Sequence, residues 1–320
     1  MKKVAVLTTG GTIASKKNDE GRLHSGALSG EDLSKQLQLP EDIKIDVYSM
    51  AQKPSMHMTF VDYDEVVQKI EEITEDDING IVITHGTDSL EEAAYYFDLT
   101  VDTTCPIVVT GSQRAPGELG SDALINLRHA VHTACSDELK NVGTVVVFNE
   151  RIFAAKYVKK EHASNIQGFN AFGFGYLGII DNDKIQMYQR PIKKEVYKPK
   201  VTEIPKVDIV KTYLGADELM IQACIKKNVD GIVIEGVGRG QVTPRMMSAI
   251  CEAIEKGIVI VITTSSEEGE VYTTYDYPGS AYDLYKNGVV LGRDYDSKKA
   301  RIKLMTLIRA KEDVKKGFQH

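Results

Sequence analysis

The stretch VAVLTTGGTIAS at residues 4–15 places a short apolar run directly before a turn built from glycine and threonine. The same arrangement returns as IVITHGTDS at residues 81–89. In open α/β sheets, ligands bind in the crevice outside the carboxyl ends of the strands. Turns on neighbouring strands would aim two hydroxyls, a carboxylate and several glycine N–H groups into one crevice. Such groups suit nucleophilic attack on a carbonyl carbon and stabilisation of the oxyanion that forms.

Short apolar runs alternate with amphipathic helical patterns along the whole chain. This alternation predicts an α/β fold with two domains, each a mostly parallel sheet flanked by helices; the larger N-terminal domain carries both threonine turns. The predicted strands cover residues 4–8, 43–48, 81–84, 106–110, 142–148, 177–180, 206–210, 231–235, 258–263 and 289–291. The predicted helices cover residues 31–37, 62–73, 90–99, 121–135, 215–228, 244–256 and 296–311.

The alternation breaks over residues 181–205, a polar stretch with three prolines and no sustained period, which is typical of an extended linker. We therefore predict an N-terminal domain over 1–190, a linker over 191–205 and a C-terminal domain over 206–320. Residues 16–30 are polar and rich in glycine, as loops that act as lids often are.

The composition is that of an ordinary globular protein, with 42% hydrophobic and 27% charged residues among 320. A net charge of −7 argues against nucleic acid or an anionic membrane as a partner. The apolar run that follows Met1 is too short for a membrane span or a secretory signal, so we expect a cytoplasmic protein. The cysteines form no C-x-x-C pair, which fits a reducing compartment, and Cys135, Cys224 and Cys251 are predicted to be buried thiols.

No histidine or cysteine cluster has the spacing of metal ligands, and neither H-E-x-x-H nor G-x-S-x-G occurs. The run GVGRGQ at residues 236–241 departs from the dinucleotide-binding fingerprint, because its third glycine comes one residue early. We therefore predict chemistry without a metal or a cofactor. The loop is expected to present Gln241 or its backbone groups to a neighbouring site.

Thr12 has three interpretations from the sequence. As a nucleophile, its hydroxyl needs an adjacent base or a proton relay, and Gly10 and Gly11 let the backbone approach a substrate closely. Alternatively, Thr12 caps the next helix, or the Gly-Gly-Thr turn holds a phosphate, although the lysine of a Walker motif is absent.

The second turn is equally open to interpretation. Asp88 could hold a substrate ammonium and Thr87 could position a water molecule, or Asp88 could simply cap the helix over 90–99. The segment Ser89–Glu92 has the spacing of a capping box. His85 ends an apolar strand and is predicted to be a hydrogen-bonded core histidine rather than a base.

A lysine beside a threonine hydroxyl can lower its pKa or accept its proton. Lys156, Lys159 and Lys160 follow the strand predicted over 142–148, and spacing alone does not choose among them. A cluster of this kind is also typical of a solvated face.

The chain resembles the bacterial-type L-asparaginases, and within them the type II group more closely. The resemblance rests on TGGTIA at 9–14 followed by HGTDSLEEAAY at 85–95, and it extends over essentially the whole chain. The supporting stretches are PIVVTGSQR at 106–114, SDALINL at 121–127, DGIVIEGVG at 230–238 and SKKAR at 297–301.

This resemblance implies a role for each turn. Thr12 would be the acyl-accepting nucleophile, and Thr87 with Lys160 would form a second hydroxyl–lysine unit. Counting from the family's asparagine at 149 to its phenylalanine at 169 selects Lys160 over its neighbours. Asp88 would join this unit to the α-amino group of the substrate.

The resemblance also implies how the substrate is bound. Ser55 would bind the α-carboxylate, with Met56 beside it. The main-chain N–H groups of Gly11 and of Thr87 or Asp88 would serve the carboxylate and the oxyanion.

Several positions depart from the family pattern. Met56 replaces a glutamine, and the loop tyrosine that usually bonds the nucleophile is missing from residues 13–47, where His24 is a candidate replacement. The family completes its site with residues of the partner subunit, and Gln241 holds the first of these places. The second, a glutamate, has no clear match within residues 272–280.

The reaction implied by the resemblance is hydrolysis of L-asparagine to L-aspartate and ammonia by a homotetramer assembled as a dimer of dimers. One alternative is a glutaminase-asparaginase that also accepts L-glutamine, since one extra methylene is discriminated by only about 1–3 kcal/mol. Another is a non-catalytic amino-acid sensor that keeps Ser55 and Asp88. Retention of Thr12, Thr87 and Lys160 argues against the sensor, because binding alone needs no nucleophile.

Overall fold

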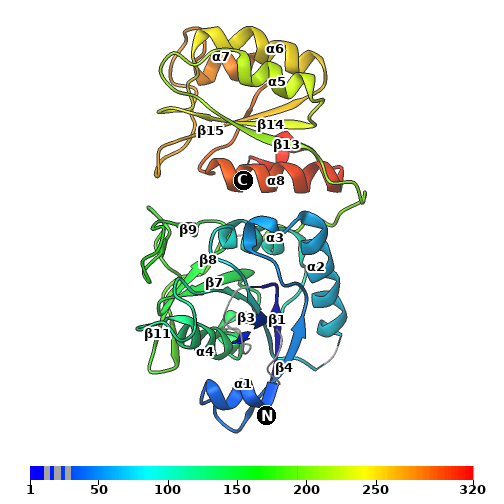
Figure 1. Ribbon diagram of the computed structural model, residues 1–320. Coiled ribbons are helices and arrows are strands. Elements are labelled where there is room, and N and C mark those ends of the chain that lie inside the picture. Colours follow the sequence, from blue (N-terminus) through cyan, green and yellow to red (C-terminus); the bar gives the residue numbers. More distant parts are fainter. Residues whose placement is uncertain (11–14, 18–22, 26–29, 76, 193, 320) are drawn as a thin grey trace. The chain divides into compact units, whose positions relative to one another are not determined.

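The computed structural model describes residues 1–10, 15–17, 23–25, 30–75, 77–192 and 194–319. It divides into two compact units, Met1–Val196 and Tyr197–His320 (Figure 1). Each unit is built around one sheet with helices packed on it. The α/β prediction, with a larger N-terminal sheet domain and a separate C-terminal domain, is therefore confirmed.

Unit 1 contains an eight-stranded sheet with the order β12-β11-β8-β7-β6-β5-β1-β4. The five strands from β4 to β7 in this order run parallel, whereas β8, β11 and β12 pair antiparallel at the other end. The strands are β1 (Lys2–Thr8), β4 (Ile43–Ser49), β5 (Gly80–Thr84), β6 (Ile107–Thr110), β7 (Thr144–Phe148), β8 (Arg151–Ala154), β11 (Gly178–Asp181) and β12 (Lys184–Met187).

The helices of unit 1 cover both faces of this sheet. Helix α4 (Ala123–Ala134) packs on a core formed by alternate residues of the central strands, among them Val6, Val82 and Val108. Helix α3 (Leu90–Thr100) contacts β6 and β7 but contributes nothing to that core, so it covers the opposite face. Helix α2 (Phe60–Thr74) packs on α3, and α1 (Gly30–Gln36) packs on β4.

Short elements complete unit 1. The strands β9 (Lys159–Lys160) and β10 (Phe169–Asn170) form an antiparallel pair, as do β2 (Ser15–Lys17) and β3 (Leu23–Ser25). Two 3₁₀ turns, η1 (Ser55–His57) and η2 (Asp137–Leu139), precede α2 and β7. None of these elements carries an apolar run long enough to predict it.

Unit 2 contains a four-stranded parallel sheet with the order β13-β14-β15-β16. Within this unit, α5 to α7 lie on one face of the sheet and α8 on the other (Figure 1). The strands are β13 (Val207–Lys211), β14 (Gly231–Gly236), β15 (Val259–Thr264) and β16 (Val290–Leu291). The helices are α5 (Leu219–Lys226), η3 (Pro244–Met246), α6 (Met247–Glu255), α7 (Ala281–Lys286), α8 (Ser297–Ala310) and α9 (Val314–Gly317).

The stretch over 181–205 is only partly extended chain. Residues 184–187 form β12, which pairs antiparallel with β11 and closes one edge of the large sheet. The interpretation of residues 181–187 as extended linker is therefore wrong, because an edge strand exposed on one side needs no long apolar run and the polar pattern of β12 concealed it. The linker over 191–205 stays a prediction. Along the chain, the boundary between the two compact units lies between Val196 and Tyr197.

The cysteines are all free thiols. Cys135 and Cys224 are buried, as predicted, whereas Cys251 is only partly buried, contrary to the prediction. Cys251 lies on α6 between buried positions 250 and 253 and faces away from the core they contact.

Candidate active site

The two threonine turns leave the same edge of the sheet. Strands β1 and β5 are parallel neighbours, and their last residues, Thr8 and Thr84, are paired in register. Thr9 ties the turns together, because its N–H and its hydroxyl both donate to the Thr84 oxygen, at 3.2 and 3.0 Å. Both turns therefore begin at the carboxyl ends of neighbouring strands, which is where open α/β sheets bind their ligands.

Gly10 lies in a conformation that a side chain would not tolerate. Its φ is +125°, and a Cβ there would lie 2.3 Å from the main-chain oxygen of Lys53. Glycine is required because the first turn presses against the segment before η1. Gly11 and Thr12, which follow, lie outside the described residues, and so does the side chain of His24, whose backbone belongs to β3.

Lys160 contacts both side chains that follow β5. Its Nζ donates to Thr87 Oγ1 at 2.9 Å and to Asp88 Oδ1 at 2.7 Å. The Lys160 side chain is 13% exposed and that of Asp88 is 66% exposed, so the ion pair is buried on the lysine side and open to solvent on the other. Asp88 thus binds the lysine, and the alternative of an Asp88 helix cap does not describe this structure.

The β9–β10 hairpin brings Lys160 to this position. Its backbone N–H donates at 2.9 Å to the carboxylate of Glu91, a buried residue in the first turn of α3. One helix therefore follows Thr87 and Asp88 and also anchors the strand that carries Lys160. Lys156 instead lies over the Tyr157 ring, with Nζ 4.8 Å from its centroid.

Gln113 is a neighbour of Thr87 that the sequence motifs did not single out. Thr87 Oγ1 donates to Gln113 Oε1 at 3.3 Å, and Gln113 Nε2 donates to the His162 oxygen at 3.3 Å. The Gln113 backbone N–H donates in turn to Asp122. In the sequence, the stretch TGSQR contributed only to the family resemblance. Its spacing does not predict that Gln113 contacts Thr87, which lies twenty-six positions earlier.

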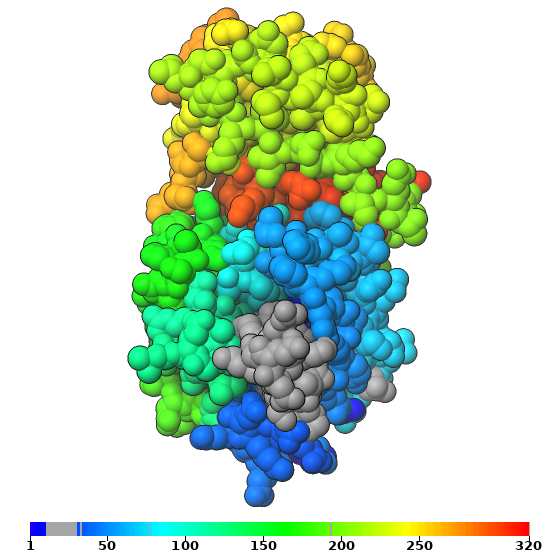
Figure 2. All heavy atoms as spheres, in the orientation of Figure 1, coloured from blue at the N-terminus to red at the C-terminus, as the bar shows by residue number. Residues whose placement is uncertain are grey.

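Ser55 lies in η1, against the second turn. A Cβ on Gly86 would lie 2.9 Å from the Cβ and 3.0 Å from the Oγ of Ser55. Ser89 Oγ donates to the Ser55 oxygen at 3.0 Å and forms no cap for α3, so the capping box predicted over Ser89–Glu92 is wrong. Met56 is 69% exposed, and the segment that carries it reaches the surface of unit 1 (blue in Figure 2).

His85 is buried beneath the second turn. Its ring contacts the Gly86 oxygen through Nδ1 at 2.8 Å and the Tyr63 hydroxyl through Nε2 at 3.1 Å. Burial lowers the pKa of His85 to about 4, so the ring is neutral at neutral pH. The prediction of a hydrogen-bonded core histidine is confirmed.

These positions place a threonine–lysine–aspartate cluster, a serine and two glycine turns at the end of neighbouring strands. A family model described as "Asparaginase, N-terminal" matches residues 3–193, and one described as "Glutaminase/Asparaginase C-terminal domain" matches residues 206–317. The chain belongs to the asparaginase family. The resemblance inferred from the sequence is confirmed.

Individual relatives support the same assignment. An L-asparaginase of Bacillus licheniformis is 60% identical over 319 residues, which is 99% of each chain. L-asparaginase 2 of Escherichia coli is 33% identical over 243 residues, or 74% of this chain and 68% of that protein. The crystal structure of a probable cytoplasmic L-asparaginase from Campylobacter jejuni matches with a TM-score of 0.87 and 29% identity over 99% of both chains.

Gln241, the residue expected at a partner's site, has a contact within unit 2. Its Oε1 accepts a hydrogen bond from the N–H of Ala281 at 2.9 Å, at the first residue of α7. The isolated bridge between Val237 and Gln241 closes the glycine loop. The amide oxygen of Gln241 is thus engaged inside the unit, while no hydrogen bond of its amide nitrogen is seen among the described residues.

Within the ranges that the structure describes, no group of three or more histidine, cysteine, aspartate or glutamate side chains has the arrangement of a metal site. In the same ranges, no helix is both long and apolar enough to span a membrane.

Proposed function

We propose that this chain hydrolyses L-asparagine to L-aspartate and ammonia through a covalent acyl-enzyme on Thr12. The observation that carries the proposal is the contact of Lys160 with both Thr87 and Asp88, at the sheet edge where the two turns begin. Membership of the asparaginase family and the 60% identity to an L-asparaginase support the substrate.

The reaction divides into two steps. In the first, the Thr12 oxygen attacks the side-chain amide carbon of asparagine, the threonine proton passes to the leaving nitrogen, and ammonia departs. In the second, water attacks the resulting ester, aspartate is released and the Thr12 hydroxyl is restored. The N–H groups of Gly11 and Thr87 are assigned to the oxyanion of both steps, and loss of one such donor typically costs about 2.7–4 kcal/mol of barrier.

Thr87 and Lys160 are assigned to proton movement. A lysine ammonium that donates to Thr87 Oγ1 stabilises negative charge as it develops on that oxygen. Thr87 already donates its own proton to Gln113, which leaves its remaining lone pair to accept a hydrogen bond from water or substrate. Thr87 would then orient the water that attacks the ester.

Asp88 and Ser55 are assigned to the α-carbon end of the substrate. One oxygen of Asp88 accepts from Lys160, and the exposed carboxylate keeps its other oxygen for the substrate ammonium. Ser55 lies against Gly86 on the neighbouring segment and would donate to the substrate carboxylate. Binding at this end holds the amide in place for attack.

Ammonia release from L-asparagine and L-glutamine, measured side by side, tests the activity. We expect release from asparagine and much less from glutamine. For the nucleophile, Thr12→Ala should abolish turnover, and intact-protein mass after a rapid quench should show an aspartyl adduct on the wild type but not on this variant. Saturable binding of asparagine without ammonia release would instead support the amino-acid sensor.

We further propose that the active form is a homotetramer, a dimer of dimers, and that it works in the cytoplasm. The family resemblance supports the assembly, and the Campylobacter jejuni relative, named a probable cytoplasmic L-asparaginase, supports the location. Sedimentation equilibrium combined with activity across a dilution series tests the assembly, since a fully active monomer would contradict it.

A further inference from the structure

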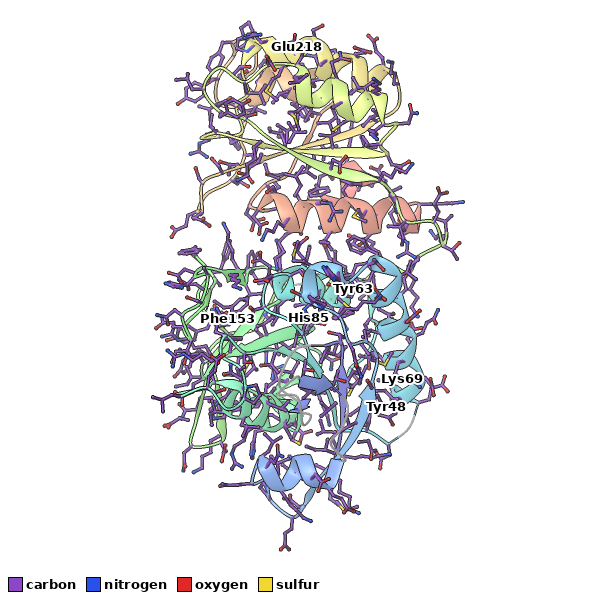
Figure 3. All side chains as sticks on the ribbon, viewed as in Figure 1. Tyr48, Tyr63, Lys69, His85, Phe153 and Glu218 are labelled. Carbon is purple, nitrogen blue, oxygen red and sulfur yellow. The ribbon has the colours of Figure 1, made fainter. Side chains whose placement is uncertain are left out.

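The Tyr63–His85 pair is a buried polar contact that the proposed reaction steps do not use. His85 directly follows β5 and is 2% exposed, and Tyr63 reaches it from α2. Figure 3 shows the two side chains close together in unit 1. The ring nitrogens of His85 lie 2.8 Å from the Gly86 oxygen and 3.1 Å from the Tyr63 hydroxyl.

These partners fix which ring nitrogen carries the proton. The Gly86 carbonyl can only accept a hydrogen bond, so Nδ1 of His85 must donate. A neutral imidazole then has an acceptor at Nε2, and the Tyr63 hydroxyl donates to it. Because burial lowers the pKa of His85 to about 4, a second proton is not bound at neutral pH. The Gly86 carbonyl therefore fixes the single ring proton of His85 on Nδ1.

The contact with Gly86 also orients the next N–H group. The described residues contain no cis peptide, so the planar Gly86–Thr87 peptide directs its carbonyl and its N–H to opposite sides. His85 holds the carbonyl on the buried side, and the N–H of Thr87 consequently points away from His85. Within the described ranges, no hydrogen-bond acceptor is found for this N–H.

We propose that His85 is a positioning residue: it locks the Gly86–Thr87 peptide so that the Thr87 N–H stays aimed at the carbonyl oxygen of the substrate during acyl transfer. This inference rests on the proposed function, which assigns that N–H to the oxyanion. Donors fixed in advance need no reorganisation when charge develops, so a peptide free to rotate would stabilise the transition state less well. Tyr63 contributes by keeping Nε2 an acceptor.

Two substitutions at His85 separate this role from a general contribution to packing. In His85→Asn, the amide nitrogen takes the place of Nδ1 and can still donate to Gly86. In His85→Gln, the amide nitrogen takes the place of Nε2, and that donor is lost. We expect kcat for asparagine to fall about tenfold or more in His85→Gln, with KM within about threefold of wild type, and to stay within about threefold in His85→Asn. Equal kcat in the two variants, or a change confined to KM, would overturn the proposal.

The protonated nitrogen can be observed in the wild type itself. Long-range ¹⁵N–¹H spectra of histidine-labelled protein should show His85 as the Nδ1–H form, with its signals assigned by their absence from His85→Asn. An Nε2–H signature would overturn the proposal even if His85→Gln fails to fold. Failure of the proposed function would look different: wild-type protein would release no ammonia while the Nδ1–H form was still present.

Discussion

Ser89 donates its side-chain hydroxyl to the main-chain oxygen of Ser55 at 3.0 Å, across 34 positions of sequence. Both residues are buried, so the bond fixes η1 against the start of α3. The serine assigned to the substrate carboxylate is thereby tied to the helix that follows the aspartate assigned to the ammonium. This contact therefore helps to hold the two groups assigned to the substrate at a fixed separation.

Replacing Ser89 should therefore weaken substrate binding. A buried hydrogen bond contributes about 0.5–1.5 kcal/mol, so Ser89→Ala should raise KM for asparagine by about two- to tenfold with little change in kcat. Steady-state kinetics of ammonia release measures both constants. Ser89→Thr keeps the hydroxyl and serves as the control, with KM near the wild-type value. A lower kcat at unchanged KM would contradict this role for Ser89.

The same pair of residues shows what the sequence could not reveal. Ser89–Glu92 has capping-box spacing, yet the Ser89 hydroxyl donates elsewhere because η1 brings a carbonyl within reach, and local spacing carries no information about that distant segment. A capping box does form at Thr59 and Asp62, where the side chain of each residue accepts from the backbone N–H of the other. The local sequence pattern thus predicted where α3 begins, but not that the Ser89 hydroxyl donates to the Ser55 oxygen.

The long apolar strands and amphipathic helices were predictable because burial of one face imposes its period on the sequence. The short strands β8, β9 and β10 were not, because two to four residues show no period. Choosing Lys160 among three lysines needed the family resemblance, since the choice depends on how the β9–β10 hairpin folds back. Gln113 was missed because its contact with Thr87 links two loops distant in sequence.

Removing Lys160 should lower turnover far more than stability. Loss of a group that assists proton transfer typically costs a factor of about 10² to 10⁴, so we expect a fall of this size in kcat for Lys160→Met. Because Asp88 is 66% exposed, water can replace its lost partner, and the change in unfolding free energy should stay within about 1 kcal/mol. Stopped assays of ammonia release and thermal melting measure the two effects.

Lys159→Met is the matched control for Lys160→Met. Lys159 belongs to the same short strand, and in a two-residue strand its side chain points to the opposite face. We expect its kcat to remain within about twofold of wild type. If both variants lost turnover equally, the assignment of Lys160 by its contacts with Thr87 and Asp88 would be wrong.

Acid should destabilise unit 1 before its carboxylates are protonated. The pKa of His85 is about 4 in the folded protein and near its ordinary 6.5 when unfolded, so below pH 6.5 the unfolded chain binds more protons. The contribution of His85 to the unfolding free energy is therefore fully present above pH 6.5. It falls by about 3 kcal/mol as the pH falls towards 4. Burial also lowers the pKa of His129 and of His132, which adds to the loss in the same direction.

Urea unfolding from pH 7 to pH 4 measures this loss. The Arg128 guanidinium holds the pKa of Asp183 below its ordinary 3.8. The contribution of that carboxylate to stability is therefore retained between pH 7 and pH 4. His85→Asn should reduce the pH dependence by about 3 kcal/mol, whatever its stability at pH 7. The same pH dependence in wild type and variant would show that His85 is not the group that titrates.

Gln241 offers a test of whether unit 2 also serves a neighbouring site. Its Oε1 accepts from the Ala281 N–H at the start of α7, so Gln241→Leu should leave that N–H without its partner and cost about 1 kcal/mol of unfolding free energy. Gln241→Glu keeps an oxygen acceptor and should melt near the wild-type temperature. If the amide nitrogen donates to a partner's site, as the family resemblance implies, Gln241→Glu should lose asparaginase activity in spite of its unchanged stability. Full activity in Gln241→Glu would confine Gln241 to the structural contact in unit 2.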